Sequence, residues 1–464
     1  MPGGATSQPV QLTLYASLPN RSEAGTVSTS TNSSMPSASP SNRSLARWTL
    51  GYCTNIHPGI EVDAICQNLQ SVSAEVAERR QEATGPLGVG LWIPHVASVA
   101  LRRHGMPPLV DAINGNKLLA YTINGFPYDN FHGERVKHAV YQPPWWSDDR
   151  VAYTRDLAKI LGELLPAGEE TGTISTLPLG WPRQVDEVES SDSETVWRDV
   201  TEDELHHAGT NFRRLAEDLR MLENRTGKRI VVAIEPEPGC LLDSPEQLVE
   251  WFQKQLPDPT HRRYIGVCHD VCHSAVMMED QRETLRRYAE AGIVLGKVQI
   301  SSAIVADWKS VEPSDHAAVL EQLRSFAEDR YLHQTGRRTA DGRFVLSDDL
   351  PELLDQTTAP VSDQRWVIHF HVPVFLESFG LLKTTRDEIA DALDAVKELS
   401  STEGGANQPP LEFTGHLEVE TYAWSVLPDA ERTGVLAIDD SLTRDQAMAR
   451  DIAYELDYVE TLLK

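Results

Sequence analysis

The chain lacks any apolar run long enough to cross a bilayer, and its few cysteines form no disulfide pattern. The five cysteines are odd in number and scattered over 464 residues, which fits a reducing compartment better than a disulfide framework. The amino-terminal region has neither a basic segment nor an uninterrupted apolar one, so export by a signal peptide is not expected. We therefore predict a cytoplasmic protein without a membrane span.

Basic residues are also in short supply. The chain has 42 Lys and Arg against 69 Asp and Glu, which gives a formal net charge of -27. Such a charge repels phosphate backbones and anionic lipid, so binding to either would need a local basic patch. The sequence contains no such patch, and we expect no nucleic-acid partner.

A glycine-rich phosphate fingerprint is missing after every predicted strand, which disfavours a doubly wound nucleotide-binding sheet. The chain instead alternates strands and helices about eight times, and the strands are near-continuous apolar runs. The strands are predicted at residues 48–57, 88–95, 118–127, 173–179, 229–238, 265–270, 294–302 and 415–422. We therefore predict an α/β protein with a single (β/α)₈ barrel over residues 45–464.

Four segments are expected outside the regular barrel. Residues 1–44 are rich in Ser, Thr, Asn, Pro and Gly, which predicts a disordered low-complexity tail. The long aromatic stretch 128–146 is interpreted as an ordered loop over a pocket. The acid-rich stretch 186–204 is expected to be a solvated excursion, and residues 303–410 a long insertion after the seventh strand.

Polar side chains collect where the predicted strands end. They are His57, His95, Asn124, Glu235, Glu237, Asp270, His273, Gln299, His369, His371, Glu418 and Glu420. In such barrels the active site lies at the carboxyl ends of the strands. Burying several carboxylates there is costly unless a bound divalent cation supplies positive charge. The pattern therefore predicts a metal site.

The strongest single signal ends the sixth predicted strand. Asp270 closes an apolar run, and the three-residue spacing brings His273 back beside it. A carboxylate oxygen and an imidazole nitrogen at that distance suit Zn, Mn or Co. One alternative is a thiolate zinc site of Cys268, His269, Cys272 and His273, although strand alternation places its first two members on opposite faces. The other alternative is a plain strand end without a metal.

Two pairs of glutamates follow apolar strands. Glu235 comes first after its strand and is predicted to be a metal ligand, whereas Glu237 suits a base or a substrate contact. The alternative for Glu237 is a solvated loop acid. Glu418 and Glu420 share a face, and we favour Glu420 because it lies nearer the strand end. Either Glu235 or Glu420 could transfer the proton in catalysis.

Other polar residues have weaker cases. His369 and His371 lie on one side of an extended segment and could serve a second metal or a substrate oxygen. Lys297 shares a strand face with Gln299 and could neutralise an enediolate, the alternative being a lysine at the rim. Candidate substrate-binding residues are His57, His95, Asn124 and Trp145. For the histidines the alternative is an ordinary core or surface position.

The strand-end residues together resemble the xylose isomerase-like TIM-barrel superfamily. That superfamily includes sugar isomerases and epimerases and the apurinic endonuclease relatives. More narrowly, the segments 52–59, 91–94, 124–128, 235–240, 331–334 and 369–371 look like the metabolite traffic protein EboE family. The resemblance covers roughly residues 47 to 464.

The superfamily resemblance implies a divalent metal ion, which could be Mn, Mg, Co or Zn. Its ligands would be Glu235, Asp270, Gln299 and Glu420, with His273, His369 and His371 matching the further histidines of multi-metal members. Gln299 departs from the histidine usual at that position in the epimerases. An amide oxygen favours Mg or Mn over Zn.

Three functions follow from these features. The first is a metal-dependent isomerase or epimerase acting on a sugar-like metabolite or sugar phosphate. The second is a non-catalytic carrier that binds a small metabolite in the same pocket; the narrower resemblance implies a role in moving or maturing such a molecule. The third is a phosphodiesterase of the apurinic endonuclease type, which the charge of -27 disfavours.

Overall fold

The computed structural model describes residues 48–80, 85–185, 197–401, 409–422 and 441–464. The predicted tail and most of the acidic excursion lie outside these residues. Within them, no helix is both long enough and apolar enough to cross a membrane.

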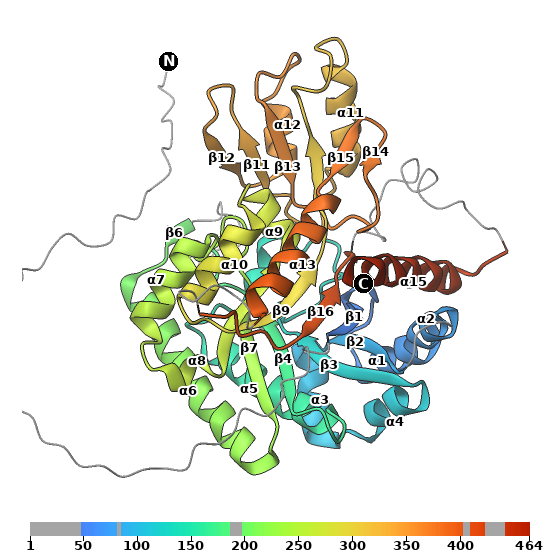
Figure 1. Cartoon of the computed structure of the whole chain (residues 1–464), viewed down its shortest axis with the longest axis vertical. Helices are drawn as coiled ribbons and strands as arrows, with labels where there is room; N and C mark the ends of the chain where they lie inside the picture. Colours follow the sequence, from blue (N-terminus) through green and yellow to red (C-terminus); the bar gives the residue numbers. More distant parts are fainter. Residues whose placement is uncertain (1–47, 81–84, 186–196, 402–408, 423–440) are drawn as a thin grey trace, which may run out of the picture. The chain divides into compact units, whose positions relative to one another are not determined.

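Eight parallel strands of the described chain close into a barrel (Figure 1). They are β1 Thr49–Cys53, β2 Leu87–Trp92, β3 Leu118–Asn124, β4 Thr171–Thr176, β7 Arg229–Ile234, β8 Ile265–Asp270, β9 Leu295–Ile300 and β16 His416–Val419. Each strand pairs with the next along the chain, and β16 pairs with β1. The predicted (β/α)₈ barrel is confirmed.

Helices follow the strands and cover the barrel. They are α1 Val62–Asn68, α2 Ala74–Arg79, α3 His95–His104, α4 Pro107–Gly115, α5 Asp148–Leu164, α6 Glu202–Thr226, α7 Pro245–Gln255, α8 Pro259–Arg262, α9 Val271–Val276, α10 Gln281–Glu290, α13 Arg386–Ser400 and α15 Arg444–Leu463. Short helical turns are η1 Thr54–Ile56, η2 Leu69–Ser73 and η3 Lys137–Tyr141. Capping boxes open α6 and α15, because Glu204 and Gln446 exchange hydrogen bonds with Thr201 and Thr443.

The insertion after the seventh barrel strand, β9, forms a second sheet. Its antiparallel strands are β10 Ile304–Ala306, β11 Thr335–Arg338, β12 Phe344–Ser347, β13 Arg365–Ile368, β14 Ser378–Phe379 and β15 Leu382–Thr384, in the order β12-β11-β13-β10-β15-β14. The helices α11 His316–Phe326 and α12 Leu350–Asp355 accompany it. Helix α13 packs against α10, so it covers the barrel rather than the second sheet.

Hydrogen bonds join the second sheet to the carboxyl ends of the barrel strands. Val372 N donates to Ser302 O at 3.0 Å, and Nδ1 of His371 lies 3.1 Å from the carbonyl oxygen of Glu420. The chain leaving β13 is thereby held across the end of the barrel at which the polar strand ends were predicted to meet. The antiparallel strands β5 Arg183–Val185 and β6 Trp197–Asp199 form a separate two-stranded sheet.

Candidate metal centre and active site

A cavity opens at the carboxyl ends of the barrel strands. Including its open mouth it holds about 550 Å³ of empty space. Its polar floor comes from residues that end the barrel strands and from the insertion, and its sides come from the loop after β3, from the insertion and from the chain after β16. The aromatic stretch 128–146 therefore does line a pocket, as predicted.

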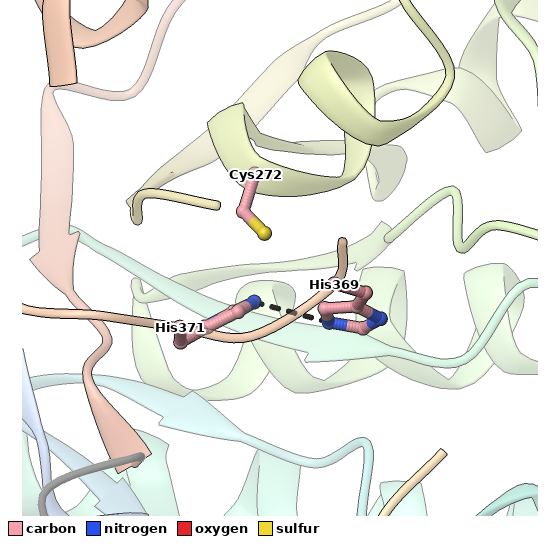
Figure 2. A group of neighbouring side chains, drawn as sticks. All are labelled: Cys272, His369 and His371. Atoms are coloured by element: carbon pink, nitrogen blue, oxygen red, sulfur yellow. Dashed lines mark hydrogen bonds between the residues drawn. The ribbon is translucent and has the colours of Figure 1, made fainter. Parts of the chain in front are cut away.

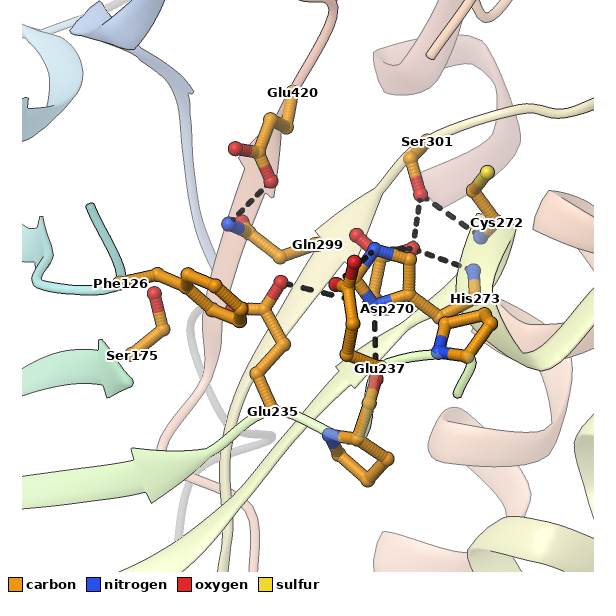
Figure 3. A network of polar contacts seen from close by, with 12 residues as sticks. Phe126, Ser175, Glu235, Glu237, Asp270, Cys272, His273, Gln299, Ser301 and Glu420 are labelled. Atoms are coloured by element: carbon orange, nitrogen blue, oxygen red, sulfur yellow. Dashed lines mark hydrogen bonds and ion pairs between the residues drawn. The ribbon is translucent and has the colours of Figure 1, made fainter. Parts of the chain in front are cut away.

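Three carboxylates converge beside this cavity, and two of them, Glu235 and Glu420, line it. Glu235 directly follows β7, Asp270 is the last residue of β8, and Glu420 directly follows β16. One oxygen from each lies within 4.8 Å of the others (Figure 3). Gln299 on β9 lies in register with Asp270, and its Nε2 donates to Glu420 Oε2 at 2.7 Å.

Three buried oxygens in this group have no hydrogen-bond partner among the described residues. They are Glu235 Oε2, Asp270 Oδ2 and Gln299 Oε1, on residues that are 3%, 2% and 0% exposed. An unsatisfied buried acceptor is costly, and a native structure normally supplies a partner for it. Oxygens of carboxylate and amide groups are the ligands that hard divalent cations prefer. The residues present therefore fit a divalent metal ion.

The electrostatics of the carboxylates agree with a missing positive charge. Burial raises the pKa of Glu235 to about 8; the positive charge of His273 offsets only part of this rise, and the neighbouring Asp270 adds to it. Burial and the charges of Glu235 and Asp270 also raise the pKa of Glu420 well above its ordinary value. Burial alone would raise the pKa of Asp270, but His273 and His371 outweigh it and hold that pKa below its usual value.

Glu420 is fixed in position by amide donors from three strands or their ends. Its Oε1 accepts from Asn55 Nδ2 at 2.6 Å and from Asn124 Nδ2 at 3.0 Å, while its Oε2 accepts from Gln299. The structure therefore places Asn124 at the cavity floor, where it was predicted to bind substrate, and its side chain orients Glu420.

His273 sits between two of the acids. Its Nδ1 donates to the carbonyl oxygen of Pro236 at 2.8 Å, which turns Nε2 towards Glu237 Oε2 at 3.2 Å and Asp270 Oδ1 at 4.0 Å. Burial lowers the pKa of His273, yet Asp270, Glu237 and Glu235 raise it further, to about 9. This orientation leaves Nε2 as the atom that could coordinate a metal, with Nδ1 held by a carbonyl as metal-ligating histidines usually are.

The insertion brings two more imidazoles to the site. Nε2 of His369 lies 3.3 Å from Nε2 of His371, and Cys272 Sγ lies with this pair within 4.8 Å (Figure 2). Asp270, His273 and His371 form another such group. Burial lowers the pKa of His371 to about 4 and that of His369 well below its ordinary value, so both rings are neutral as metal ligands must be. These groups could hold a second metal ion next to the carboxylates.

The alternative thiolate site does not assemble. Cys268 is fully buried on β8, whereas His269 on the opposite face has its Nε2 2.7 Å from Gln281 Oε1. No candidate metal group among the described residues contains Cys268 or His269. All five cysteines are buried and free, and burial raises the pKa of the Cys272 thiol well above its ordinary value.

Residues from far along the chain complete the hydrogen bonding around Glu237. Gln334, just before β11, accepts from His369 Nδ1 at 2.8 Å and donates to Glu237 Oε1 at 3.2 Å. Tyr141 donates to the same oxygen at 2.9 Å. Sequence reasoning did not select Gln334, Tyr141 or Asn55 as functional, although all three lie in stretches singled out as motifs or loops.

Lys297 lies below the cavity rather than at its rim. It is 0% exposed on β9, forms an ion pair with Glu418 and lies 3.5 Å from Ser175 Oγ. Burial alone would lower the pKa of Lys297, but the Glu418 carboxylate raises it above its ordinary value. Lys297 is therefore engaged inside the barrel and does not line the cavity.

Three predicted substrate contacts lie away from the cavity. The η1 turn breaks strand alternation, so Asn55 faces the cavity while Nε2 of His57 lies 3.0 Å from the Tyr52 hydroxyl. His95 begins α3 and stacks on Tyr128 with ring centroids 4.5 Å apart. Trp145 is fully buried against Phe212, with centroids 3.9 Å apart, and donates to Leu177 O at 3.1 Å. These three residues have structural contacts instead.

No family model matches the chain, and no curated protein matches it. The solved structures that resemble it include xylose isomerase-like barrels. D-allulose 3-epimerase from Methylomonas sp. is 7% identical, with 90% of this chain and 98% of that chain covered and a TM-score of 0.43. A magnesium complex of a xylose isomerase-like TIM-barrel protein from Mycobacterium smegmatis is 10% identical, with coverages of 90% and 98% and a TM-score of 0.43.

D-psicose 3-epimerase with D-tagatose from Clostridium cellulolyticum H10 is 13% identical, with coverages of 90% and 99% and a TM-score of 0.40. At these identities and scores the similarity concerns the fold, which the closed strand order establishes by itself. The narrower resemblance to the EboE family stays a prediction.

Proposed function

We propose that the chain is a divalent-metal-dependent isomerase or epimerase of a small sugar-like hydroxy-carbonyl compound. The observation that carries this proposal is the group of unpaired oxygens on Glu235, Asp270 and Gln299, which lies beside a cavity that Glu235 and Glu420 line. Barrels of this type place their reacting groups at that end. The D-allulose and D-tagatose complexes among the similar structures concern sugars bound to those proteins.

Four residues would hold the metal ion: Glu235, Asp270, Gln299 and Glu420. When bound, a divalent ion stabilises the negative oxygen of an enediolate as a Lewis acid. The amide oxygen of Gln299 favours Mg or Mn over Co or Zn. His273, His369 and His371 would serve a second ion or the substrate oxygens.

Glu235 is the residue we assign to proton transfer at carbon. Its Oε2 has no hydrogen-bond partner among the described residues, and Glu235 lines the cavity, so its carboxylate can exchange a proton with a bound compound. Glu420 is held through both oxygens by amide donors, which restricts it to binding and orientation. Glu237, fixed by Tyr141 and Gln334, would contact a substrate hydroxyl.

The experiment is metal analysis of the purified chain, followed by an assay for deuterium uptake from solvent at carbon over a panel of hydroxy-carbonyl compounds. The Mg- or Mn-loaded protein is expected to catalyse exchange. Glu235→Gln should lower the exchange rate by about 10² to 10⁴-fold, the usual contribution of a general base.

The matched control is Glu279→Gln. Glu279 is a half-buried acid whose pKa burial raises to about 8, and it does not line the cavity. Its substitution should leave exchange near the wild-type rate. Absence of bound metal together with absence of exchange for every compound would refute the proposed activity.

A carrier that binds the same compound without turnover is the second candidate. The observation in its favour is that the insertion lines the cavity with Tyr331, His369 and His371, so a bound ligand would contact both the barrel and the insertion. Mass spectrometry of gently purified protein separates the two functions. A carrier would retain a small molecule and release it unchanged, whereas an isomerase would release a mixture of isomers.

A further inference from the structure

The sides of the cavity differ sharply from its floor. Above the carboxylates the lining is built from aromatic rings: Phe126, Phe131, Tyr141, Tyr331 and Tyr422. They come from the loop after β3, from the insertion and from the chain following β16. Three distant segments of sequence therefore combine into one aromatic wall.

The rings hold one another in place. The centroid of Phe131 lies 4.9 Å from that of Tyr331 and 5.5 Å from that of Tyr422, and the two tyrosine rings are 5.0 Å apart. The Tyr331 hydroxyl donates to the carbonyl oxygen of Phe131 at 3.1 Å, and the Tyr141 hydroxyl donates to Glu237. Since these hydroxyls are used within the protein, the wall presents mainly carbon to a ligand.

The wall also lacks a usable Lys or Arg charge. Lys137 is the one lysine or arginine among the described lining residues, and its Nζ lies 2.5 Å from Asp349 Oδ2. Asp349 is held in turn, because its Oδ1 accepts from His333 N at 3.2 Å. A phosphate group entering this cavity would meet acids on the floor and a neutralised lysine on the side.

These two properties constrain the ligand. A free hexose can direct two or three oxygens to the floor, but its remaining hydroxyls would face rings that offer no partner, and an unpaired buried hydroxyl is unfavourable. An aromatic ring in the same position would bury no hydroxyl without a partner, and it would gain stacking contacts with Phe131 and Tyr331. The wall therefore matches an aromatic substituent better than a polyol chain.

We propose that the ligand is an unphosphorylated hydroxy-carbonyl compound that carries an aromatic ring. Its vicinal oxygens lie at Glu235, Asp270 and Gln299, and its ring lies against the wall formed by Phe131, Tyr331 and Tyr422. The placement of the oxygens rests on the proposed metal-dependent function, whereas the placement of the ring rests on the wall alone.

The test compares three probes that share one hydroxy-ketone group. They are 2-hydroxy-1-phenylethanone, hydroxyacetone and dihydroxyacetone phosphate. Each is titrated calorimetrically into the full chain loaded with Mn. The aryl compound is expected to bind at least about tenfold more tightly than hydroxyacetone, and the phosphate at least about tenfold more weakly than the aryl compound. Equal affinities, or tightest binding of the phosphate, would overturn the proposal.

A matched pair of variants locates the ring. Phe131 and Trp92 belong to the same aromatic cluster, but Trp92 does not line the cavity. Phe131→Leu should remove most of the preference for the aryl compound while leaving hydroxyacetone binding unchanged, and Trp92→Leu should keep the preference. An equal loss in both variants would overturn the assigned contact. If either variant fails to fold, the three-probe comparison on the wild-type chain still decides.

A second variant tests the charge argument. Asp349→Asn frees Lys137 but keeps a side-chain oxygen for His333 N. It should strengthen binding of dihydroxyacetone phosphate by about tenfold and leave hydroxyacetone unchanged. An unchanged phosphate affinity would show that Lys137 does not govern phosphate exclusion and would overturn that part of the proposal.

The two proposals fail in different ways. If the metal-dependent function is wrong, none of the probes will bind more tightly with Mn than after chelation. If the ligand class is wrong, all three will bind in a metal-dependent manner but without preference for the aryl compound. Retained aryl preference without metal dependence would support the wall and reject the metal chemistry.

Discussion

Two buried groups of charged side chains lie one above the other in the barrel, and only the lower one is neutralised by the protein. Strand β9 supplies Lys297 below and Gln299 above, and β16 and its end supply Glu418 below and Glu420 above. Residues two apart share a strand face. The lower pair is a fully buried Lys297–Glu418 ion pair, and the upper pair is an uncharged hydrogen bond from Gln299 to Glu420 at 2.7 Å.

Strand β9 carries a lysine, Lys297, in the lower group and a glutamine, Gln299, in the upper group. This difference makes the lower group a structural ion pair and leaves the upper group as a candidate metal site. The Lys297–Glu418 pair is tightly packed: a Cβ on Gly90 would lie 1.3 Å from Glu418 Oε1, so only glycine leaves that space. One Glu418 oxygen also lacks a hydrogen-bond partner, but in the upper group Glu235 and Glu420 have raised pKa values and form no ion pair with a lysine or arginine of the described residues. Buried carboxylates without a protein cation are typical of a position that a metal ion completes.

The largest expected effect comes from removing the cation of the lower group. Lys297→Met leaves the Glu418 charge buried and unpaired, which should lower the free energy of unfolding by about 3–5 kcal/mol. Urea denaturation at pH 7 measures this. The double variant Lys297→Met with Glu418→Gln should recover most of the loss, because no buried charge remains.

Metal content provides the check on the comparison itself. The single variant, when folded, should still bind metal to the wild-type stoichiometry, since the upper ligands are intact. A loss below about 1 kcal/mol would contradict the assignment of Lys297 and Glu418 as a structural ion pair.

The second effect comes from withdrawing the cation of the upper group. A chelator should lower the free energy of unfolding of the wild-type chain by about 3 kcal/mol relative to metal at 100 times its dissociation constant. Asp270→Asn should abolish this response. Its metal-free form should fold, because an asparagine oxygen can still accept from His273 N and Ser301 Oγ, at present 2.9 and 2.8 Å from Asp270 Oδ1.

Asp243→Asn is the matched control, since Asp243 is a partly buried acid that lines a small neighbouring pocket together with Asp270 but belongs neither to the cavity lining nor to a candidate metal group. It should respond to chelator like the wild type. A wild-type melting temperature that changes neither with chelator nor with added Mn, Mg, Co or Zn would contradict the proposed metal site.

The third test makes the upper group resemble the lower one. Gln299→Lys places a cation beside Glu420, as Lys297 stands beside Glu418. It should eliminate metal binding and make the metal-free fold about 1–2 kcal/mol more stable than metal-free wild type at pH 8, by offsetting the repulsion among the carboxylates. Gln299→Met, which removes the amide without adding charge, should weaken metal binding without this gain. Equal stability of the two variants would show that charge is not what the upper group lacks.

The barrel and the ends of its strands were readable from the sequence because both depend on local pattern. Ile265–Asp270 is an apolar run that ends in a carboxylate, and the same holds for the run before Glu235. Strand alternation also placed Lys297 and Gln299 correctly on one face, but it does not indicate how far below the cavity each side chain lies. Local pattern could not show that Lys297 lies one layer below the cavity and forms an ion pair with Glu418.

The rest of the site depends on geometry that no local pattern contains. The η1 turn reverses which residue faces inward, so Asn55 rather than His57 reaches the cavity. Gln334 reaches Glu237 from a segment almost a hundred residues away, across a sheet whose pairing is non-local. Trp145 follows an aromatic loop but turns into the core against Phe212. Such choices are made by tertiary packing.

The smallest effect contrasts the cavity with the buried His57, a candidate substrate contact that does not line it. Burial, together with His132, lowers the pKa of His57 from an ordinary value of about 6.5 to about 3. Between these values the folded chain binds fewer protons than the unfolded chain, so the stabilising contribution is present above pH 6.5 and lost as the pH falls towards 3. The free energy of unfolding should fall by about 1 kcal/mol between pH 6.5 and 5.5.

His57→Gln should remove this pH-dependent loss, whereas His104→Gln, at an exposed helix end, should not. Urea midpoints of chelator-treated protein across this pH range measure the difference. Because His57 touches Tyr52 and not the cavity, the variant should also keep wild-type metal binding and exchange activity; a loss of either would return His57 to the site.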